Sequence, residues 1–185
     1  MILRRKKDTT MPDEQFMRRA IALSQTAIST ASGPPFGAVI VRDGEVIAEG
    51  FNHVHADNDP TAHAEIVAIR EACRVSASPF LDGCTIYSSS EPCPMCMSAI
   101  YWSRLSAVYF ATDREDAARA GFDDRVLYAE LQRPLEQRNI PTIRMLSAEG
   151  QATFDLWQVE AHSAVQTRLG EATPTETAMV GEAWE

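Results

Sequence analysis

Apolar residues near the start of the chain recur every three or four positions, at Phe16, Ala20, Leu23 and Ala27. This spacing places their side chains on one face of a helix. Pro12 suits the first position of that helix, and the stretch Ser32-Gly33-Pro34-Pro35 is typical of its end. We therefore predict an amphipathic helix that begins near residue 12 and buries one face.

The pattern then changes to one typical of strands. Residues 36–41 form a short apolar run, and the pair Asp43-Gly44 precedes a second segment that ends at Asn52. An Asp-Gly pair between two such segments is a strong signal for a β-hairpin. Two histidines and two aspartates follow in residues 53–60, but their spacing matches no strong metal-binding motif. We interpret that stretch as a solvated loop.

Helical and strand patterns alternate through the rest of the chain. Thr61 is predicted to cap a helix that runs to about residue 75. Strand patterns follow over residues 84–89, 107–111 and 142–146, and helical patterns over 92–101, over 113–120 and around Phe154 and Trp157. Strands that alternate with helices indicate a layered α/β fold with some parallel strand pairing.

The length and composition are those of one folded domain. The 185 residues suffice for a sizeable core, and no internal repeat or second domain is apparent. We predict a flexible arm over residues 1–11 and a single domain over residues 12–168. Gly, Pro, Thr and Glu dominate residues 169–185, so we predict a disordered tail there.

Charge and hydropathy argue against two classes of partner. The net charge of −9 argues against a large phosphate-binding surface, so nucleic acid is not the expected partner. No apolar run approaches the length needed to span a membrane. The basic residues 1–7 lack the apolar stretch of a signal peptide, and we expect a cytoplasmic protein.

The candidate chemistry lies in two motifs that are far apart in the sequence. Cys93 and Cys96 are three positions apart at the predicted start of a helix, which places both sulfurs on one face. The helix N-terminus favours thiolates, the form of cysteine that binds metal. His63 completes a set of three ligands. Three protein ligands and an open fourth position are the arrangement of catalytic zinc.

The cysteines have other interpretations. A thioredoxin-like redox pair would also use Cys93 and Cys96, but it leaves His63 unexplained. Structural disulfides are not favoured without a secretory signal. We interpret Cys73 and Cys84 as small core residues.

Glu65 follows His63 by two residues and is the candidate proton carrier. On an ideal helix that interval is about 200°, so Glu65 is not expected to be a ligand beside His63. However, His-x-Glu followed by Pro-Cys-x-x-Cys is the signature of zinc deaminases, in which the glutamate is the general acid/base. The role of Glu65 is therefore inferred from the signature and not from helical periodicity.

These residues resemble the cytidine deaminase superfamily and, within it, the bacterial guanine deaminases. The similarity runs from about residue 35 to residue 157. The zinc-binding blocks are common to the whole superfamily, whereas the block Gly121-Phe122-Asp123-Asp124 points to guanine. The other matching blocks are residues 35–41, which begin Pro-Phe-Gly-Ala, and residues 99–102, Ala-Ile-Tyr-Trp.

The resemblance implies a three-layer αβα fold around a central five-stranded mixed sheet. It identifies His63, Cys93 and Cys96 as the ligands of one Zn²⁺ with water or hydroxide in the fourth position, and it identifies Glu65 as catalytic. Enzymes of this kind also form homodimers by exchanging C-terminal segments. The aromatic residues of the predicted final helix are therefore expected to pack on another subunit.

Three further roles come from the same resemblance. Asn52 matches an asparagine that hydrogen-bonds the base, Asp124 matches a catalytic aspartate near the departing amino group, and Phe36 matches an aromatic neighbour of the ring. From the sequence alone, Asn52 could also cap the loop that follows its strand, and Asp124 could cap a helix after Gly121.

One feature of the family has no counterpart here. A tyrosine near the chain end closes over the substrate in the relatives, but no tyrosine follows Tyr128 in this chain, and the matching place is near Gln166. Either His162, Trp184 or another group does that work, or the substrate differs.

The implied function is zinc-dependent hydrolysis of a nucleobase, guanine, to xanthine and ammonia. The alternatives among enzymes are deamination of guanosine, of a cytosine-type substrate or of tRNA adenosine, and the last predicts a basic surface. A different class is a non-catalytic binding module stabilised by zinc. That module would need a fourth ligand, such as His53.

Overall fold

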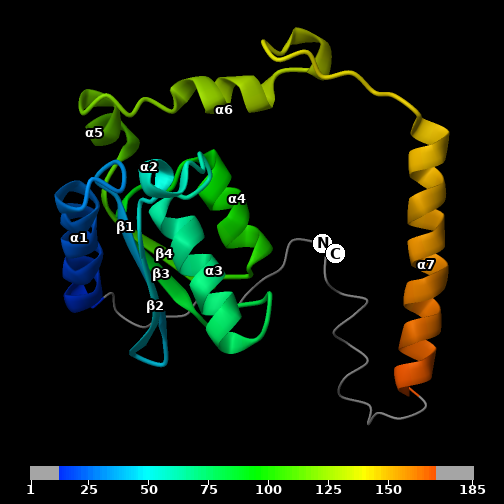
Figure 1. Cartoon of the computed structure of the whole chain (residues 1–185), viewed down its shortest axis with the longest axis horizontal. Coiled ribbons are helices and arrows are strands. Elements are labelled where there is room, and N and C mark those ends of the chain that lie inside the picture. The colour runs from blue at the N-terminus through cyan, green and yellow to red at the C-terminus, as the bar shows by residue number, and fades with distance from the viewer. Residues whose placement is uncertain (1–12, 170–185) are drawn as a thin grey trace. The chain divides into compact units, whose positions relative to one another are not determined.

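The computed structural model describes residues 13–169, which form two compact units, 13–132 and 133–169 (Figure 1). The predicted arm over residues 1–11 lies outside the described residues, and so does the predicted tail apart from Leu169. The predicted domain over residues 12–168 includes both units, and their assignment to one domain stays a prediction.

A four-stranded mixed sheet organises the first unit, with the strand order β2-β1-β3-β4. β1 (Gly37–Arg42) pairs antiparallel with β2 (Glu45–Phe51) and with β3 (Thr85–Ser90), and β3 pairs parallel with β4 (Ala107–Thr112). The predicted hairpin is confirmed. Asp43 and Gly44 connect its strands, and both have the positive φ that a two-residue turn of this kind requires.

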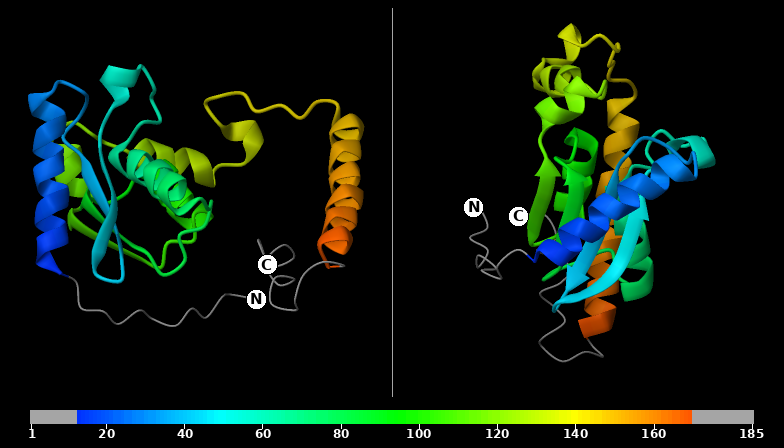
Figure 2. Two further views of the ribbon diagram at one scale, coloured as in Figure 1. Left: turned by 60° about the horizontal axis from the view of Figure 1, so that its bottom comes forward. Right: turned by 90° about the vertical axis from the view of Figure 1, so that its left-hand side faces the viewer.

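Helices cover both faces of the sheet and produce three layers (Figure 2). α1 (Glu14–Ser29) packs on one face, and α3 (Ala64–Ser76) and α4 (Pro94–Trp102) pack on the other. The core under α1 includes Phe16, Ala20, Leu23, Val39, Val41 and Tyr87. The core under α3 and α4 includes Ile40, Ala48, Ala68, Ile69, Ile86 and Ile100.

The predicted amphipathic helix is confirmed as α1, although it begins at Glu14. Asp13 is its N-cap residue, and the Asp13 side chain accepts a hydrogen bond from the backbone N–H of Gln15 at 2.9 Å. A capping side chain of this kind satisfies an N–H group that has no partner within the helix, which explains why the helix begins after Asp13.

α3 lies unusually close to the sheet at Gly50 of β2. A Cβ atom at Gly50 would lie 2.3 Å from the carbonyl oxygen of Ala64 and 2.7 Å from the backbone nitrogen of Ala68. Only glycine permits this approach. The first turns of α3 are therefore held directly against β2.

Three short helices complete the first unit. α2 (Val54–Asp57) lies within the segment predicted to be a loop, so that prediction is wrong for one helical turn. α5 (Arg114–Arg119) has Asp113 as its N-cap residue, and a capping box with Asp116 stabilises its start. α6 (Arg125–Gln132) follows the segment 121–124, which separates it from α5.

The predicted fifth strand over residues 142–146 is wrong. The second unit contains η1 (Leu135–Gln137) and α7 (Ser147–Leu169), and its described residues include no strand with which such a segment could pair. A strand needs a neighbour for its backbone N–H and C=O groups. The predicted final helix is confirmed, since α7 contains Phe154 and Trp157. Among the described residues, no helix is both long and apolar enough to cross a membrane.

Candidate active site

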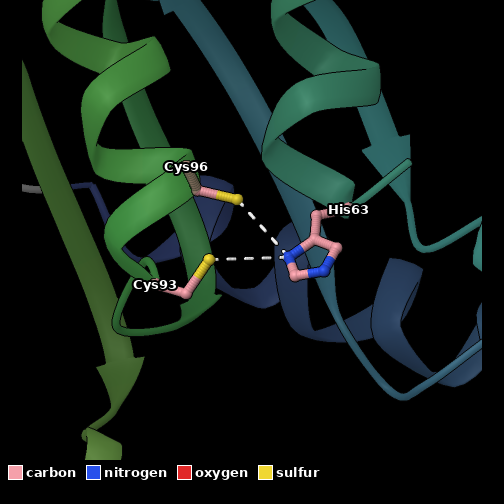
Figure 3. A group of neighbouring side chains, drawn as sticks. All are labelled: His63, Cys93 and Cys96. Atoms are coloured by element: carbon pink, nitrogen blue, oxygen red, sulfur yellow. Dashed lines mark hydrogen bonds between the residues drawn. The ribbon is translucent and has the colours of Figure 1, made fainter. Parts of the chain in front are cut away.

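The N-termini of α3 and α4 bring the candidate metal ligands together (Figure 3). His63 is the N-cap residue of α3 and Cys93 is the N-cap residue of α4, and both have an extended backbone. The prediction of Thr61 as the cap is wrong, because α3 begins at Ala64. Neither N-cap side chain hydrogen-bonds its own helix, so imidazole and thiol are free to face each other. Cys96 is buried in the first turn of α4.

The ligand atoms have the separations that tetrahedral zinc requires. Nδ1 of His63 lies 3.7 Å from Sγ of Cys93 and 3.5 Å from Sγ of Cys96, and the three atoms lie within 4.8 Å of one another. Zinc bonds of about 2.3 Å to sulfur and about 2.0–2.1 Å to nitrogen at tetrahedral angles would separate sulfur and nitrogen by about 3.6 Å. The donor set therefore fits zinc in both chemistry and spacing.

The two sulfurs differ in how they hold a proton. A hydrogen bond from Cys96, together with the neighbouring His63, lowers the pKa of Cys93 to about 4. The same hydrogen bond and burial raise the pKa of Cys96. Cys93 is therefore a thiolate at neutral pH, and a divalent cation has to displace the proton of Cys96 before both sulfurs can bind it.

A buried carboxyl group, that of Glu65, lies beside these ligands. Oε1 of Glu65 accepts a hydrogen bond from the Ser88 hydroxyl at 3.3 Å, and Oε2 of Glu65 lies 3.4 Å from Sγ of Cys96. Burial raises the pKa of Glu65. A carboxyl group in this environment holds a proton more readily than an exposed one, as a general acid/base near neutral pH must.

The angle of about 200° expected between His63 and Glu65 on an ideal helix does not apply here. His63 precedes α3 and is extended, whereas Glu65 is a residue of the first turn. An angle per residue applies only between positions that are both helical. Glu65 is outside the group of ligand atoms, and its carboxyl group contacts one of the ligands, Cys96.

A cavity of about 380 Å³ opens beside the ligands. Its walls include His63, Glu65 and Cys93. The other predicted site residues, Phe36, Asn52 and Asp124, line the same cavity. The structure thus brings all the predicted catalytic and substrate-binding residues to one place. The volume is at the lower end of the range of about 300–1,000 Å³ that is typical of small-molecule sites.

The side-chain amide of Asn52 is buried and held in one orientation. Its Oδ1 accepts a hydrogen bond from the backbone N–H of Val54 at 3.1 Å, which is the loop-capping role that the sequence left open. The amide nitrogen remains as a donor for another group. A Cβ atom at Gly33 would lie 2.1 Å from this Oδ1, so a glycine at position 33 makes room for the amide.

Asp124 and Phe36 lie on other walls of the cavity. Asp124 immediately precedes α6, where burial and the negative charge of Cys93 raise its pKa and Arg114 lowers it. The ring of Phe36 meets the ring of Phe122 edge to face, with centroids 5.2 Å apart. These rings give the cavity an apolar aromatic wall, suited to one edge or face of a planar molecule.

Three residues near the site were given no role by the sequence. Ser88 is a buried polar residue of β3 and lies on the same face as Ile86. Alternation along the strand predicts that position to be buried, so a serine there is a signal that the sequence contains. Glu91 and Arg114 form an ion pair between the segment before Cys93 and the start of α5. No local pattern indicates that pair, because its members come from different elements.

Among the described residues, His53 is outside the group of neighbouring ligand atoms, so it does not supply a fourth protein ligand. Its Nδ1 lies 3.4 Å from a carboxylate oxygen of Asp57, and its ring packs against Phe51 at 4.4 Å between centroids. All four cysteines are free. The substitute for the family's terminal tyrosine stays an open prediction, because Trp184 and the side chain of His162 lie outside what the structure describes.

The chain is similar to known deaminases. The sequence profile of the cytidine and deoxycytidylate deaminase zinc-binding region matches residues 10–112. Guanine deaminase from Bacillus subtilis (strain 168) is 49% identical over 148 residues, which are 80% of this chain and 95% of that relative. An X-ray structure of guanine deaminase from Bacillus subtilis matches with a TM-score of 0.78 and 49% identity, covering 80% of this chain and 94% of that chain. A tRNA-specific adenosine deaminase from Aquifex aeolicus (strain VF5) is 42% identical over 101 residues, which are 55% of this chain and 66% of the relative.

Proposed function

Because this chain belongs to the zinc-binding cytidine and deoxycytidylate deaminase family, we propose that it hydrolyses guanine to xanthine and ammonia. The observation that carries this proposal is the group of His63, Cys93 and Cys96 around one point, with the carboxyl group of Glu65 in contact with it. The name and the 49% identity of the Bacillus subtilis relative support guanine as the substrate.

One Zn²⁺ fits the donor set, bound by Nδ1 of His63 and the sulfurs of Cys93 and Cys96. When bound, zinc supplies a Lewis acid that lowers the pKa of a water molecule in the open fourth position. The charges of two thiolates offset that of the ion, so the site stays close to neutral and accepts an uncharged base.

Glu65 moves the first proton of the reaction. Its carboxylate takes a proton from the attacking water and delivers it to N3 of guanine while the water oxygen bonds to C2. The Ser88 hydroxyl holds Oε1 of Glu65, which limits the rotation of the carboxyl group between these two positions. A positioned acid/base of this kind contributes typically about 10²–10⁴-fold to the rate.

Asn52 and the two phenylalanines orient the base. The amide oxygen of Asn52 is engaged by Val54, so its amide nitrogen is the group that donates to the substrate. Guanine offers the acceptors O6 and N7 along one edge, which suits such a donor. Phe36 and Phe122 supply an aromatic wall against which the ring packs.

Asp124 acts on the departing amino group. Collapse of the tetrahedral centre at C2 breaks the bond from C2 to the exocyclic nitrogen. A proton from the Asp124 carboxyl group converts that nitrogen into the better leaving group, ammonia, and the Asp124 carboxylate regains a proton from the hydroxyl group at C2 as the carbonyl of xanthine forms. The place of Asp124 on the wall of the same cavity as Glu65 supports this assignment.

A free base suits this site better than tRNA does. The cavity is small, and the chain has a net charge of −9, whereas a surface that binds a phosphate backbone is normally basic. The tRNA-specific relative also matches a smaller share of this chain than the guanine deaminase does. These features favour a nucleobase over a polynucleotide.

Ammonia release from the zinc-loaded protein tests the proposal. We expect release from guanine, with formation of xanthine, and little from guanosine, cytosine, cytidine, adenine or a tRNA anticodon stem-loop. Glu65→Gln should lower the activity about 10²–10⁴-fold. Glu71→Gln is the matched control, because Glu71 lies on the same helix but is paired with Arg74. Ammonia release from one of the other compounds and not from guanine would show that guanine is not the substrate. A zinc-loaded protein that releases ammonia from none of them would favour a binding module.

We also propose a homodimer with exchanged C-terminal segments. The side chains of Phe154 and Trp157 are 66% and 68% exposed, and Ile140, Ile143 and Met145 are exposed as well. An apolar surface of this kind is usually covered by a partner. We expect sedimentation equilibrium to find a dimer, and Phe154→Glu with Trp157→Glu to weaken it. A monomeric wild-type protein at micromolar concentration would contradict this proposal.

A cytoplasmic location is proposed on the chemistry of the cysteines. All four are free, and the two at the site have to remain available as thiolates. A reducing compartment preserves that state. Fractionation of cells that express the protein checks this expectation, and recovery outside the cytoplasm would contradict it.

A further inference from the structure

Arg114, the first residue of α5, does not line the cavity, but it contacts Glu91, which does, and Tyr128 of α6. Its guanidinium binds both carboxylate oxygens of Glu91, with Nη2 2.5 Å from Oε1 and Nε 3.3 Å from Oε2. The backbone N–H of Arg114 also donates to Oε2 of Glu91, at 3.2 Å. Glu91 therefore receives three hydrogen bonds from one residue.

Glu91 is connected directly to the metal-binding segment. It lies two residues before Cys93 and lines the cavity. Its own backbone N–H donates to the carbonyl oxygen of Thr112 at 2.8 Å. The bonds to Arg114 and Thr112 hold the segment that leads into α4, and they hold it from the side of β4 and α5.

The other face of the guanidinium reaches the helix that follows Asp124. The Cζ atom of Arg114 lies 4.5 Å from the centroid of the Tyr128 ring, the geometry of a cation–π contact. Tyr128 lies one turn along α6 from Asp124, and the backbone N–H groups of Leu127 and Tyr128 donate to the carbonyl oxygen of Asp124 at 2.9 and 3.4 Å. The position of Tyr128 is thereby coupled to that of Asp124.

We infer that Arg114 is a positioning residue that sets the distance between Asp124 and the metal-binding segment. It binds Glu91 on one side and the Tyr128 ring on the other, so it connects the segment before α4 with α6. The inference rests on the proposed function, because it assigns Asp124 to the departing amino group. Misplacement of a catalytic group by about 1 Å costs about 10²-fold in rate.

The chemistry of arginine suits this task and that of lysine does not. A guanidinium is planar, so it binds a carboxylate through two parallel hydrogen bonds while its face stacks on an aromatic ring. An ammonium group is a point charge on a flexible stem, and it can keep the ion pair with Glu91 without also stacking on Tyr128. Arg114→Lys therefore separates charge from geometry.

The test compares Arg114→Lys with Arg119→Lys in the zinc-loaded full chain. Arg119 lies on the same helix and is paired with Asp116, so its substitution is the matched control and is expected to leave activity unchanged. Arg114→Lys is expected to lower kcat for guanine about 10- to 100-fold, with KM changed less. Tyr128→Leu should act in the same direction, and Tyr128→Phe, which keeps the ring, should have a smaller effect.

A second substrate distinguishes positioning from general damage. With 2-chloro-6-oxopurine, the water oxygen bonds to C2 and one water proton passes to N3. The C2–Cl bond then breaks, chloride leaves and the proton of the C2 hydroxyl group is released to solvent, so no amine has to be protonated. If Arg114 acts through Asp124, then Arg114→Lys and Asp124→Asn should lower chloride release much less than ammonia release from guanine. In an Asp124→Asn background, Arg114→Lys should add little to the loss with guanine.

Zinc content and the visible spectrum of the cobalt-substituted protein provide readouts besides activity, and both should match the wild type. Equal losses with both substrates, or an altered cobalt spectrum, would overturn the inference in favour of a merely structural role. Unchanged turnover of guanine by Arg114→Lys would overturn the inference about Arg114 and leave the proposed function standing. A wild-type protein that releases no ammonia from guanine would overturn the proposed function and this inference together.

Discussion

The two faces of the sheet in the first unit bury different kinds of side chain. Under α1 an apolar and aromatic cluster fills the core, in which the ring centroid of Phe16 lies 5.4 Å from that of Tyr87, and the buried polar residues on the Tyr87 side of β3 are the uncharged Thr85 and Ser89. Under α3 and α4, Glu65, Ser88 and Cys96 are buried within an otherwise apolar core. A buried polar group lowers stability unless it finds partners, so a cluster of them on one face indicates a functional site. We expect substitutions of apolar residues under α1 to change stability, and substitutions of Glu65, Ser88 and Cys96 to change activity.

Loss of a metal ligand should have the largest effect. Cys96→Ala removes one of three ligands, so zinc content should fall well below one per chain and ammonia release should fall to background. Metal analysis and the ammonia assay measure both. Cys73→Ala is the control, because Cys73 is a free cysteine of α3 outside the ligand group. A Cys96→Ala protein with full zinc content and activity would contradict the assignment.

Glu65→Gln should come next and should separate chemistry from folding. The substitution removes the proton carrier while keeping its shape, so we expect kcat to fall about 10²–10⁴-fold. Because burial disfavours a charged carboxylate, the melting temperature should be unchanged or higher. Steady-state kinetics and thermal unfolding provide the comparison. If Glu65→Gln were destabilised but fully active per folded molecule, the result would contradict the expectation that Glu65 serves activity and not stability.

Phe16→Ala should show the opposite behaviour. The Phe16 ring is buried against Tyr87 and the strands, and its loss should lower the free energy of unfolding by about 3–5 kcal/mol. Activity per folded molecule should stay the same. Urea unfolding gives the stability, and Ile28→Ala is the control because that α1 side chain is 63% exposed. A large drop in kcat without loss of stability would contradict the expected role of this face.

Gly33→Ala should have the smallest effect and should act on binding. The added methyl group would displace the amide of Asn52, which is held by one hydrogen bond to Val54. Loss of one hydrogen bond to substrate, worth about 0.5–1.5 kcal/mol, should raise KM for guanine about 2- to 10-fold. Gly150→Ala is the control, because a Cβ there meets no neighbouring atom. An unchanged KM would show that Asn52 does not contact the base.

Local patterns predicted much of the fold. The spacing of Phe16, Ala20 and Leu23 predicted the buried face of α1, and Asp43-Gly44 predicted the hairpin. Both depend on interactions between residues that are close in the chain. The strand predicted over residues 142–146 is wrong because a strand depends on a neighbouring strand, and the composition of residues 142–146 does not show whether such a neighbour exists.

The candidate site was predicted by its motifs and not by its contacts. The spacing of His63, Cys93 and Cys96 indicated zinc, but helical periodicity placed Glu65 on a different face from His63 because it treated both residues as helical. In the structure His63 is the N-cap residue and precedes the helix, so that angle does not apply. Ser88 carried a weak signal, a buried polar position on a strand, and Arg114 carried none.

By itself, the sequence determined the ligand types, their order along the chain and the faces of the helices that bury apolar residues. These properties follow from side-chain chemistry and from spacing over a few residues. Only the tertiary structure decided that Ser88 holds Glu65 and that Arg114 joins Glu91 to Tyr128. The physical reason is that such contacts depend on how the sheet orders its strands, and outside the zinc-binding motifs residues distant in sequence carry no mark of which neighbours they will meet.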